Sequence, residues 1–96
     1  MKKQPCVYIM ANNKNGAIYV GVTSNLIARV YQHKQQIVDG FAKKYNCKYL
    51  VYYEHFENML TAISREKQIK SGSRKKKIAL IEKTNQEWKD LCDSLI

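Results

Sequence analysis

The spacing of hydrophobic and polar positions changes several times along the chain, and each change marks an expected element. Short runs rich in β-branched and aromatic residues occupy 6–10 and 17–22, on either side of the turn-like segment "ANNKNG". These two runs are predicted to form a β-hairpin. A third run at 49–56, "YLVYYEHF", has the same strong β propensity and is expected to join the hairpin as a third strand.

Between and after these runs, apolar residues recur at helical spacing. A helix is predicted over 25–38, with Thr23 or Ser24 as its N-cap and Gly40 as its end. Asn58 is expected to cap a second helix over 59–70.

The rest of the chain continues in the same way. Gly72 is expected to end the second helix in a left-handed conformation, and Ser73 to cap a third helix through "RKKKIALIEK". Thr84 and Glu87 make a capping-box pattern before a last helix at about 85–95. The order β-β-α-β-α-α-α predicts an α+β fold in which helices flank a small three-stranded antiparallel sheet. Its 96 residues suit a single domain, 1–96, with a core at about 5–82.

Charge points to the kind of partner. The chain has 17 Lys and Arg against 8 Asp and Glu, a net charge of +9. A polyanion is therefore the expected partner, and six basic residues that follow Glu66 without an intervening acid are the candidates to bind it: Lys67, Lys70, Arg74, Lys75, Lys76 and Lys77. A disordered basic arm is the alternative, but apolar residues at helical spacing follow directly.

Cysteine content and hydropathy indicate the compartment. Cys6, Cys47 and Cys92 are odd in number and form no CxxC pair, which argues against a disulfide framework and a structural zinc site. No stretch approaches the roughly 20 apolar residues of a membrane helix, and the N-terminal run is too short for the core of a signal peptide. A cytoplasmic protein with no membrane partner is expected.

The least ordinary residue is Glu66. With ~100° per residue, it lies in the middle of the apolar stripe of its helix, near Ala62 and Ile69. A carboxylate facing a core costs several kcal/mol unless it is paired or coordinates a metal. Two interpretations remain open: an ion pair with Lys70 one turn on, or a functional group opposite the carboxylate.

Four further polar or aromatic residues lie where they could share a ligand. Arg29 and His33 occupy one edge of the first helix, a single turn apart, although each could also be an ordinary surface residue. Tyr8 and Tyr19 are central on neighbouring strands, where cross-strand aromatic packing is the default explanation. Gly21 ends its strand and would let a helix or ligand approach the backbone closely, or would serve a simple bulge.

These residues occur in an order that matches a known family. The triplet at 6–8 is "CVY", the triplet at 19–21 is "YVG", Arg29 and His33 follow at one-turn spacing, and Glu66 lies in "SREKQIK". Over roughly residues 5–82 the chain resembles the GIY-YIG nuclease superfamily, specifically its short stand-alone bacterial members.

The resemblance implies metal-dependent hydrolysis of phosphodiester bonds. Glu66 would hold one Mg²⁺ or Mn²⁺, and Arg29 would bind the scissile phosphate. Tyr8 or Tyr19 would activate water, with His33 as the proton relay. Many members carry an Asn a dozen or so residues after the Glu, whereas "SGSRKKKIAL" holds none, and a Ser or Lys there would have to replace its contact.

Three functional interpretations follow. The leading one is an endonuclease acting on DNA rather than RNA, and the main rival is a non-catalytic DNA- or RNA-binding module that retains the fold. The third is association with structured RNA, for which the aromatic run at 49–56 could stack on bases. Because the chain is nearly all catalytic core, weakly specific or structure-dependent binding is expected, and a recruiting protein partner could supply specificity.

Overall fold

Three strands form the centre of the molecule. The computed structural model describes residues 4–36 and 40–95. In it β1 (Cys6–Ala11), β2 (Ile18–Thr23) and β3 (Tyr49–His55) make one antiparallel sheet in the order β2-β1-β3. The predicted hairpin and the third strand are confirmed, and β1 is the central strand.

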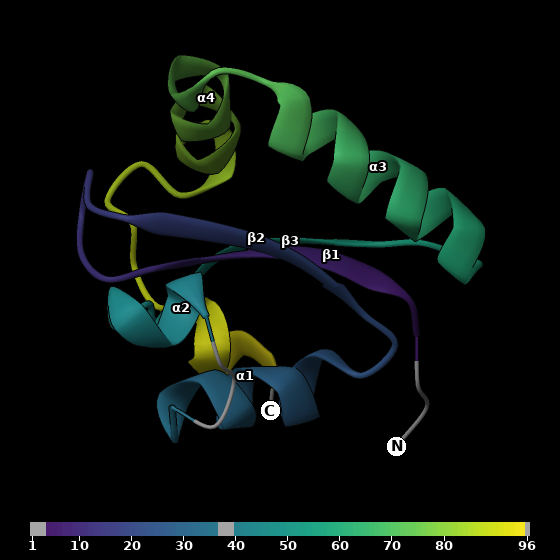
Figure 1. Ribbon diagram of the computed structural model, residues 1–96, viewed down its shortest axis with the longest axis horizontal. Coiled ribbons are helices and arrows are strands. Elements are labelled where there is room, and N and C mark those ends of the chain that lie inside the picture. The colour runs from purple at the N-terminus through teal and green to yellow at the C-terminus, as the bar shows by residue number, and fades with distance from the viewer. Residues whose placement is uncertain (1–3, 37–39, 96) are drawn as a thin grey trace.

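Helices cover both faces of this sheet (Figure 1). On one face lie α1 (Leu26–Lys34), α2 (Phe41–Lys44) and a final 3₁₀ turn, η1 (Leu91–Leu95), while α3 (Met59–Ser71) and α4 (Arg74–Thr84) lie on the other. The predicted α+β class with helices flanking a small sheet is confirmed. The short helix α2 lies between α1 and β3, where no helix was predicted. None of the helices in the described ranges is long and apolar enough to cross a bilayer.

The sheet divides the core in two. All six residues of β1 are buried, and alternate residues point to opposite faces. Val7 and Ile9 pack with residues of α3 and α4, whereas Tyr8 and Met10 pack with residues of α1 and α2. Because β1 is buried on both faces, residues on its α1 side are held in a closely packed environment.

The predicted caps of α3 and α4 are confirmed, and that of α1 is wrong. The side chains of Asn58 and Ser73 accept hydrogen bonds from the backbone N–H groups at the starts of α3 and α4. The cap of α1 is Asn25 rather than Thr23 or Ser24: its side chain accepts from the N–H of Ala28 at 3.2 Å, while Thr23 Oγ1 accepts from the Asn25 N–H.

The end of α1 also comes earlier than expected. The helix stops at Lys34, and Gln36 follows with φ 56°, a left-handed conformation that a continuing helix excludes. The last two positions of the predicted 25–38 helix, 37 and 38, lie outside the described residues. Gly72 is not left-handed as predicted, since its φ of −76° and ψ of 163° are extended. The chain there passes from α3 straight into the cap of α4, so no left-handed residue is needed.

The predicted C-terminal helix over 85–95 is wrong, because only η1 is helical. Thr84 is the last residue of α4, so it cannot open a new helix with Glu87. Asn85 uses its side chain to bind the Val51 carbonyl at 3.1 Å and both backbone groups of Lys89. Trp88 is buried with φ 58°, which a right-handed helix cannot accommodate.

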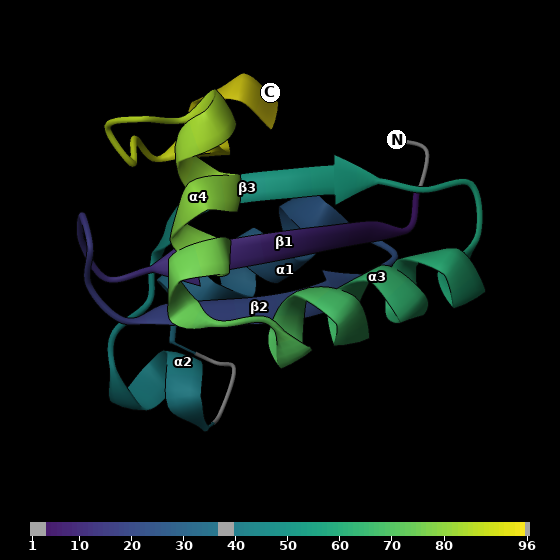
Figure 2. The same cartoon turned by 90° about the horizontal axis from the view of Figure 1, so that it is seen from above.

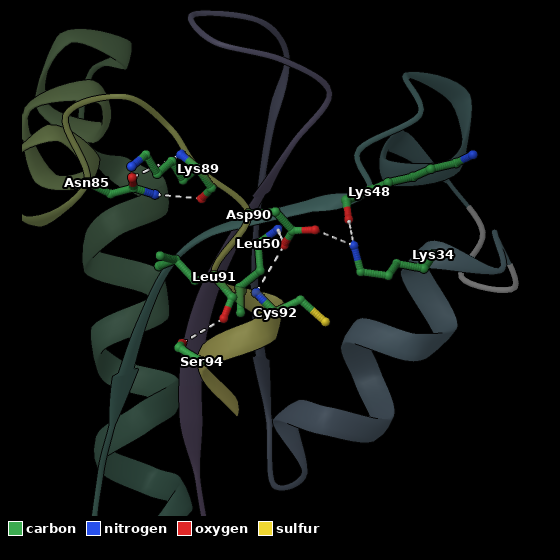
Figure 3. A network of polar contacts seen from close by, with 9 residues as sticks. All are labelled: Lys34, Lys48, Leu50, Asn85, Lys89, Asp90, Leu91, Cys92 and Ser94. Atoms are coloured by element: carbon green, nitrogen blue, oxygen red, sulfur yellow. Dashed lines mark hydrogen bonds and ion pairs between the residues drawn. The ribbon is translucent and has the colours of Figure 1, made fainter. Parts of the chain in front are cut away.

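This C-terminal segment instead ties α1 to the sheet (Figure 3). One carboxylate oxygen of Asp90 accepts from the backbone N–H groups of Leu50 and Cys92, each at 3.1 Å. The other oxygen pairs with Lys34 Nζ at 2.6 Å. The last turn of α1 is therefore anchored to β3.

As the sequence indicated, all three cysteines are free thiols, with Cys6 and Cys47 buried.

Candidate active site

Four of the predicted site residues gather on the α1 side of the sheet. The hydroxyl of Tyr8 lies 3.0 Å from Nε2 of His33, and Arg29 Nη1 donates to the same hydroxyl at 3.5 Å. The ring of Tyr19 has its centroid 5.3 Å from that of His33 and 6.3 Å from that of Tyr8. These four residues are called the Tyr8 cluster below.

The strand register explains how the tyrosines meet. Tyr8 pairs with Gly21 and Met10 pairs with Tyr19, so the two tyrosines are diagonal neighbours on one face. A Cβ at Gly21 would lie 2.5 Å from both Cζ and the hydroxyl oxygen of Tyr8. Gly21 is thus needed because the Tyr8 ring crosses its backbone. The group that closely approaches this glycine is the side chain of Tyr8, and not the helix or ligand that was expected.

The helix α1 supplies the other two groups. Arg29 and His33 lie one turn apart on one edge of the helix, as predicted, and the structure shows that both contact Tyr8. His33 is only 3% exposed, so the alternative of an ordinary surface histidine is wrong. Arg29 is half-buried and can still reach a ligand from solvent.

Burial sets the protonation states of this cluster. Burial, with a smaller contribution from the Arg29 charge, lowers the pKa of His33 to about 4. Burial also raises the pKa of Tyr8 to about 12, although the hydrogen bond from Arg29 opposes the change. Near neutral pH, a phenol therefore faces a neutral imidazole, and the Tyr8 hydroxyl and Nε2 of His33 share a hydrogen bond.

Glu66 lies apart from the Tyr8 cluster. It projects from α3, on the opposite face of the sheet, between the buried residues Ala62 and Ile69. Its side chain is 14% exposed, and one carboxylate oxygen pairs with Lys70 Nζ at 2.9 Å. Glu66 thus lies in the apolar stripe of its helix, as the sequence indicated. Of the two interpretations left open there, the structure shows the ion pair with Lys70.

The two sets of residues nevertheless flank one strand. Figure 2 shows α3 running beside β2, the edge strand that carries Tyr19, and α3 packs against β2. The contacts among the described residues join Glu66 to Lys70 and not to the Tyr8 cluster. A phosphate at this edge would have the tyrosines and Arg29 on one side of β2 and the carboxylate on the other.

The donor set fits a hard, largely hydrated cation. The described residues contain no group of three or more His, Cys, Asp or Glu side chains that could enclose a metal, so a closed zinc-type site is not formed by them. Mg²⁺ commonly keeps several waters and binds through one or two carboxylates together with substrate phosphate. Glu66 is the carboxylate that would hold such an ion, in place of the Lys70 ammonium.

The predicted nucleic-acid-binding residues differ in their surroundings. Lys70 pairs with Glu66, and Arg74 donates to the backbone carbonyls of Asn15 and Gly16 at 2.8 and 2.7 Å. These two cations therefore also hold the fold together. The remaining four are exposed or half-exposed on α3 and α4: Lys67, Lys75, Lys76 and Lys77.

Sequence reasoning missed one supporting contact, between Asp90 and Lys34. It anchors α1 immediately after His33 and joins residues 56 positions apart. A single acid near the C-terminus carries no local pattern that indicates such a partner.

The two serines that could replace the family's Asn are engaged locally: the Ser71 hydroxyl donates to the Gln68 carbonyl, and that of Ser73 caps α4.

Comparison with known proteins shows the family of this chain. The chain matches the model of the GIY-YIG catalytic domain over residues 4–79 and belongs to that family. The UPF0213 protein of Staphylococcus haemolyticus is 36% identical over 76 residues, covering 79% of this chain and 92% of the relative. A UPF0213 protein of Staphylococcus aureus is 35% identical over 75 residues, covering 78% and 90%.

A solved structure supports the fold. The solution NMR structure of a UPF0213 protein from Bacillus halodurans superimposes with a TM-score of 0.57 and covers 91% of this chain and 92% of its own. The two sequences are 24% identical, so this likeness concerns architecture alone. The resemblance to short stand-alone members of the family is confirmed.

Proposed function

We propose that this protein is a metal-dependent endonuclease that hydrolyses phosphodiester bonds in DNA, in the cytoplasm, where its three free thiols stay reduced. The GIY-YIG superfamily is generally one of nucleases, which supports the enzyme class. The observation that carries the proposal is the joint contact of Arg29 and His33 with the Tyr8 hydroxyl. A cation and a neutral base thereby meet at one point of a protein with charge +9.

Arg29 binds the scissile phosphate in this proposal. Its half-buried guanidinium is planar and can form two parallel hydrogen bonds to phosphate oxygens. As the phosphorus is attacked, negative charge grows on those oxygens. A positioned cation beside them stabilises the transition state more than the ground state.

The two tyrosines have different tasks. Tyr19 is half-exposed, so it can orient the attacking water, whereas Tyr8 is buried and contacts His33. A proton leaving the water passes to the Tyr8–His33 pair, in which the neutral imidazole has one nitrogen able to accept a proton. The low pKa of His33, about 4, keeps that acceptor available at neutral pH.

Glu66 completes the site by holding the cation, Mg²⁺ or Mn²⁺. When bound, such an ion polarises a phosphoryl oxygen and stabilises the leaving oxygen. The Glu66 side chain is 14% exposed, so its carboxylate is partly shielded from solvent yet still open to an ion. Lys70 has to release the carboxylate when the ion binds.

Nicking of supercoiled plasmid tests the proposal. Wild type is compared with Arg29→Ala and Glu66→Gln, with Mg²⁺, Mn²⁺ or EDTA, and each variant's fold is checked by circular dichroism. Loss of one group that stabilises the transition state typically costs about 10²–10³ in rate. Lys83→Ala removes the same charge as Arg29→Ala from an exposed residue at the far end of α4 and should cut at the wild-type rate.

One observation favours a second candidate, a non-catalytic nucleic-acid-binding module. The Lys70 ammonium already neutralises Glu66, so the carboxylate has a structural partner without any metal. This candidate predicts salt-sensitive binding of DNA or RNA with no metal-dependent nicking. Wild type that binds but never cuts, under all three metal conditions, would favour it over the endonuclease.

A further inference from the structure

A pocket of about 370 Å³ opens between the end of α3 and the start of α4. Its polar lining comes from three cations, one amide and one hydroxyl: Arg65, Lys76, Lys77, Gln68 and Ser71. No carboxylate lines it. The pocket is separate from the Tyr8 cluster, which lies across the sheet.

The lysines of this pocket have no ionic partner within the described residues, unlike their neighbours. Lys70 pairs with Glu66, and Arg74 binds the carbonyls of the β1–β2 turn. By contrast, Lys76 and Lys77 form no ion pair in the described part of the chain. Their charges are therefore available to a ligand.

Arg65 is held in place at the edge of the same pocket. Its Nε donates to Glu54 at 3.0 Å and its Nη1 donates to the side-chain oxygen of Gln68 at 2.7 Å. These bonds fix the orientation of the guanidinium, and because Glu54 offsets the charge of Arg65, the two lysines supply the net positive charge of the pocket. A rigid cation next to two flexible ones suits an anion with several oxygen atoms.

Gly72 keeps the junction of the two helices open. Its extended backbone conformation is one that any residue adopts, so conformation does not explain the glycine. A Cβ there would lie 3.3 Å from the Ile69 carbonyl oxygen and 3.7 Å from Cβ of Lys76. A side chain would thus crowd the turn and occupy part of the wall of the pocket.

We propose that this α3–α4 pocket binds a backbone phosphate of the nucleic acid at a position other than the scissile one, an assignment that rests on the proposed function for the identity of the ligand. The largest extent of the molecule is 31 Å. Phosphates along one strand of a duplex follow every ~3.4 Å, so about nine of them span the whole protein. Because α3 packs against β2, a strand that passes the β2 edge can continue over the α3–α4 face, where the pocket would fix its position relative to that edge.

Salt-dependent binding tests the pocket without any cleavage. Anisotropy of labelled single-stranded and duplex DNA is measured in EDTA over a range of KCl for Lys76→Ala and Lys77→Ala. Lys83→Ala and Lys89→Ala each remove the same charge from an exposed residue that does not line the pocket and has no predicted role in binding. Loss of one phosphate contact lowers the slope of log K against log salt by about one. We expect that decrease for Lys76 and Lys77, and less than half of it for the two comparison variants.

The outcomes separate this proposal from the nuclease. Equal losses for all four lysines would overturn the pocket and leave only diffuse attraction, while nicking that depends on Arg29 would still stand. A selective loss at Lys76 and Lys77 in a protein that never cuts would keep the pocket and reject the nuclease. Wild type that binds neither form of DNA overturns both.

Discussion

Replacing Gly21 with alanine would put a methyl group where the ring of Tyr8 lies. The added carbon would be 2.5 Å from two atoms of that ring, well inside any real carbon contact. Tyr8 is fully buried and lies against His33, so it cannot turn away. Forcing extra volume into a packed core costs about 1–3 kcal/mol, and the reduced freedom of the unfolded alanine chain returns about 0.4–1 kcal/mol. A net loss of about 1–2 kcal/mol is expected.

Urea denaturation followed by circular dichroism measures this loss as a lower midpoint at unchanged slope. In a domain of this size, each kcal/mol also lowers the melting temperature by roughly 4–8 °C. A double-mutant cycle isolates the contact: in a Tyr8→Leu background, Gly21→Ala should cost less than about 0.5 kcal/mol, since the crowding ring is gone. Full stability of Gly21→Ala, or the same cost in both backgrounds, would refute the packing argument.

Three further predictions follow from the site and its supports. His33 takes up a proton near pH ~6.5 in the unfolded chain but only near pH 4 in the folded protein, so the free energy of unfolding should fall as the pH drops through that window. NMR titration of the imidazole checks this, together with a flatter dependence of stability on pH in His33→Gln; titration of His33 near 6.5 in the folded protein would contradict it. Lys70→Ala should lower the Mn²⁺ concentration needed for half-saturation, because the Lys70 ammonium no longer competes with the ion for Glu66. Electron paramagnetic resonance measures this binding, and unchanged or weaker binding of Mn²⁺ would count against Glu66 as the ligand. Asp90→Asn should lower stability by about 1–2 kcal/mol by weakening the anchor of α1, and a cost no greater than that of the exposed control Asp93→Asn would show that this anchor is unimportant.

The Tyr8 cluster was predictable because its members are set by local periodicity. Strand alternation fixes which face Tyr8 and Tyr19 occupy, and helix periodicity fixes that Arg29 and His33 share an edge. The burial of His33 was not predictable. It depends on Tyr8 and on the packing of α1 against the sheet, which no spacing within the helix reports.

The C-terminal segment shows where local rules lose to tertiary contacts. Thr84 and Glu87 satisfy a capping-box spacing, yet Asn85 is held by the Val51 carbonyl, 34 positions away, and Trp88 is buried. Hydrogen bonds and apolar burial on this scale outweigh a cap worth about 1 kcal/mol. The position of Glu66 relative to the Tyr8 cluster is likewise a property of how α3 packs beside β2, and the sequence pattern alone contains no such distance.

The measurement that tests the central claim most directly is plasmid nicking by matched protein samples. The account predicts that wild type and Lys83→Ala cut in Mg²⁺ or Mn²⁺ and stop in EDTA, while folded Arg29→Ala and Glu66→Gln lose about 10²-fold or more. Cleavage that persists in EDTA, or that is equal in Glu66→Gln and wild type, would contradict it.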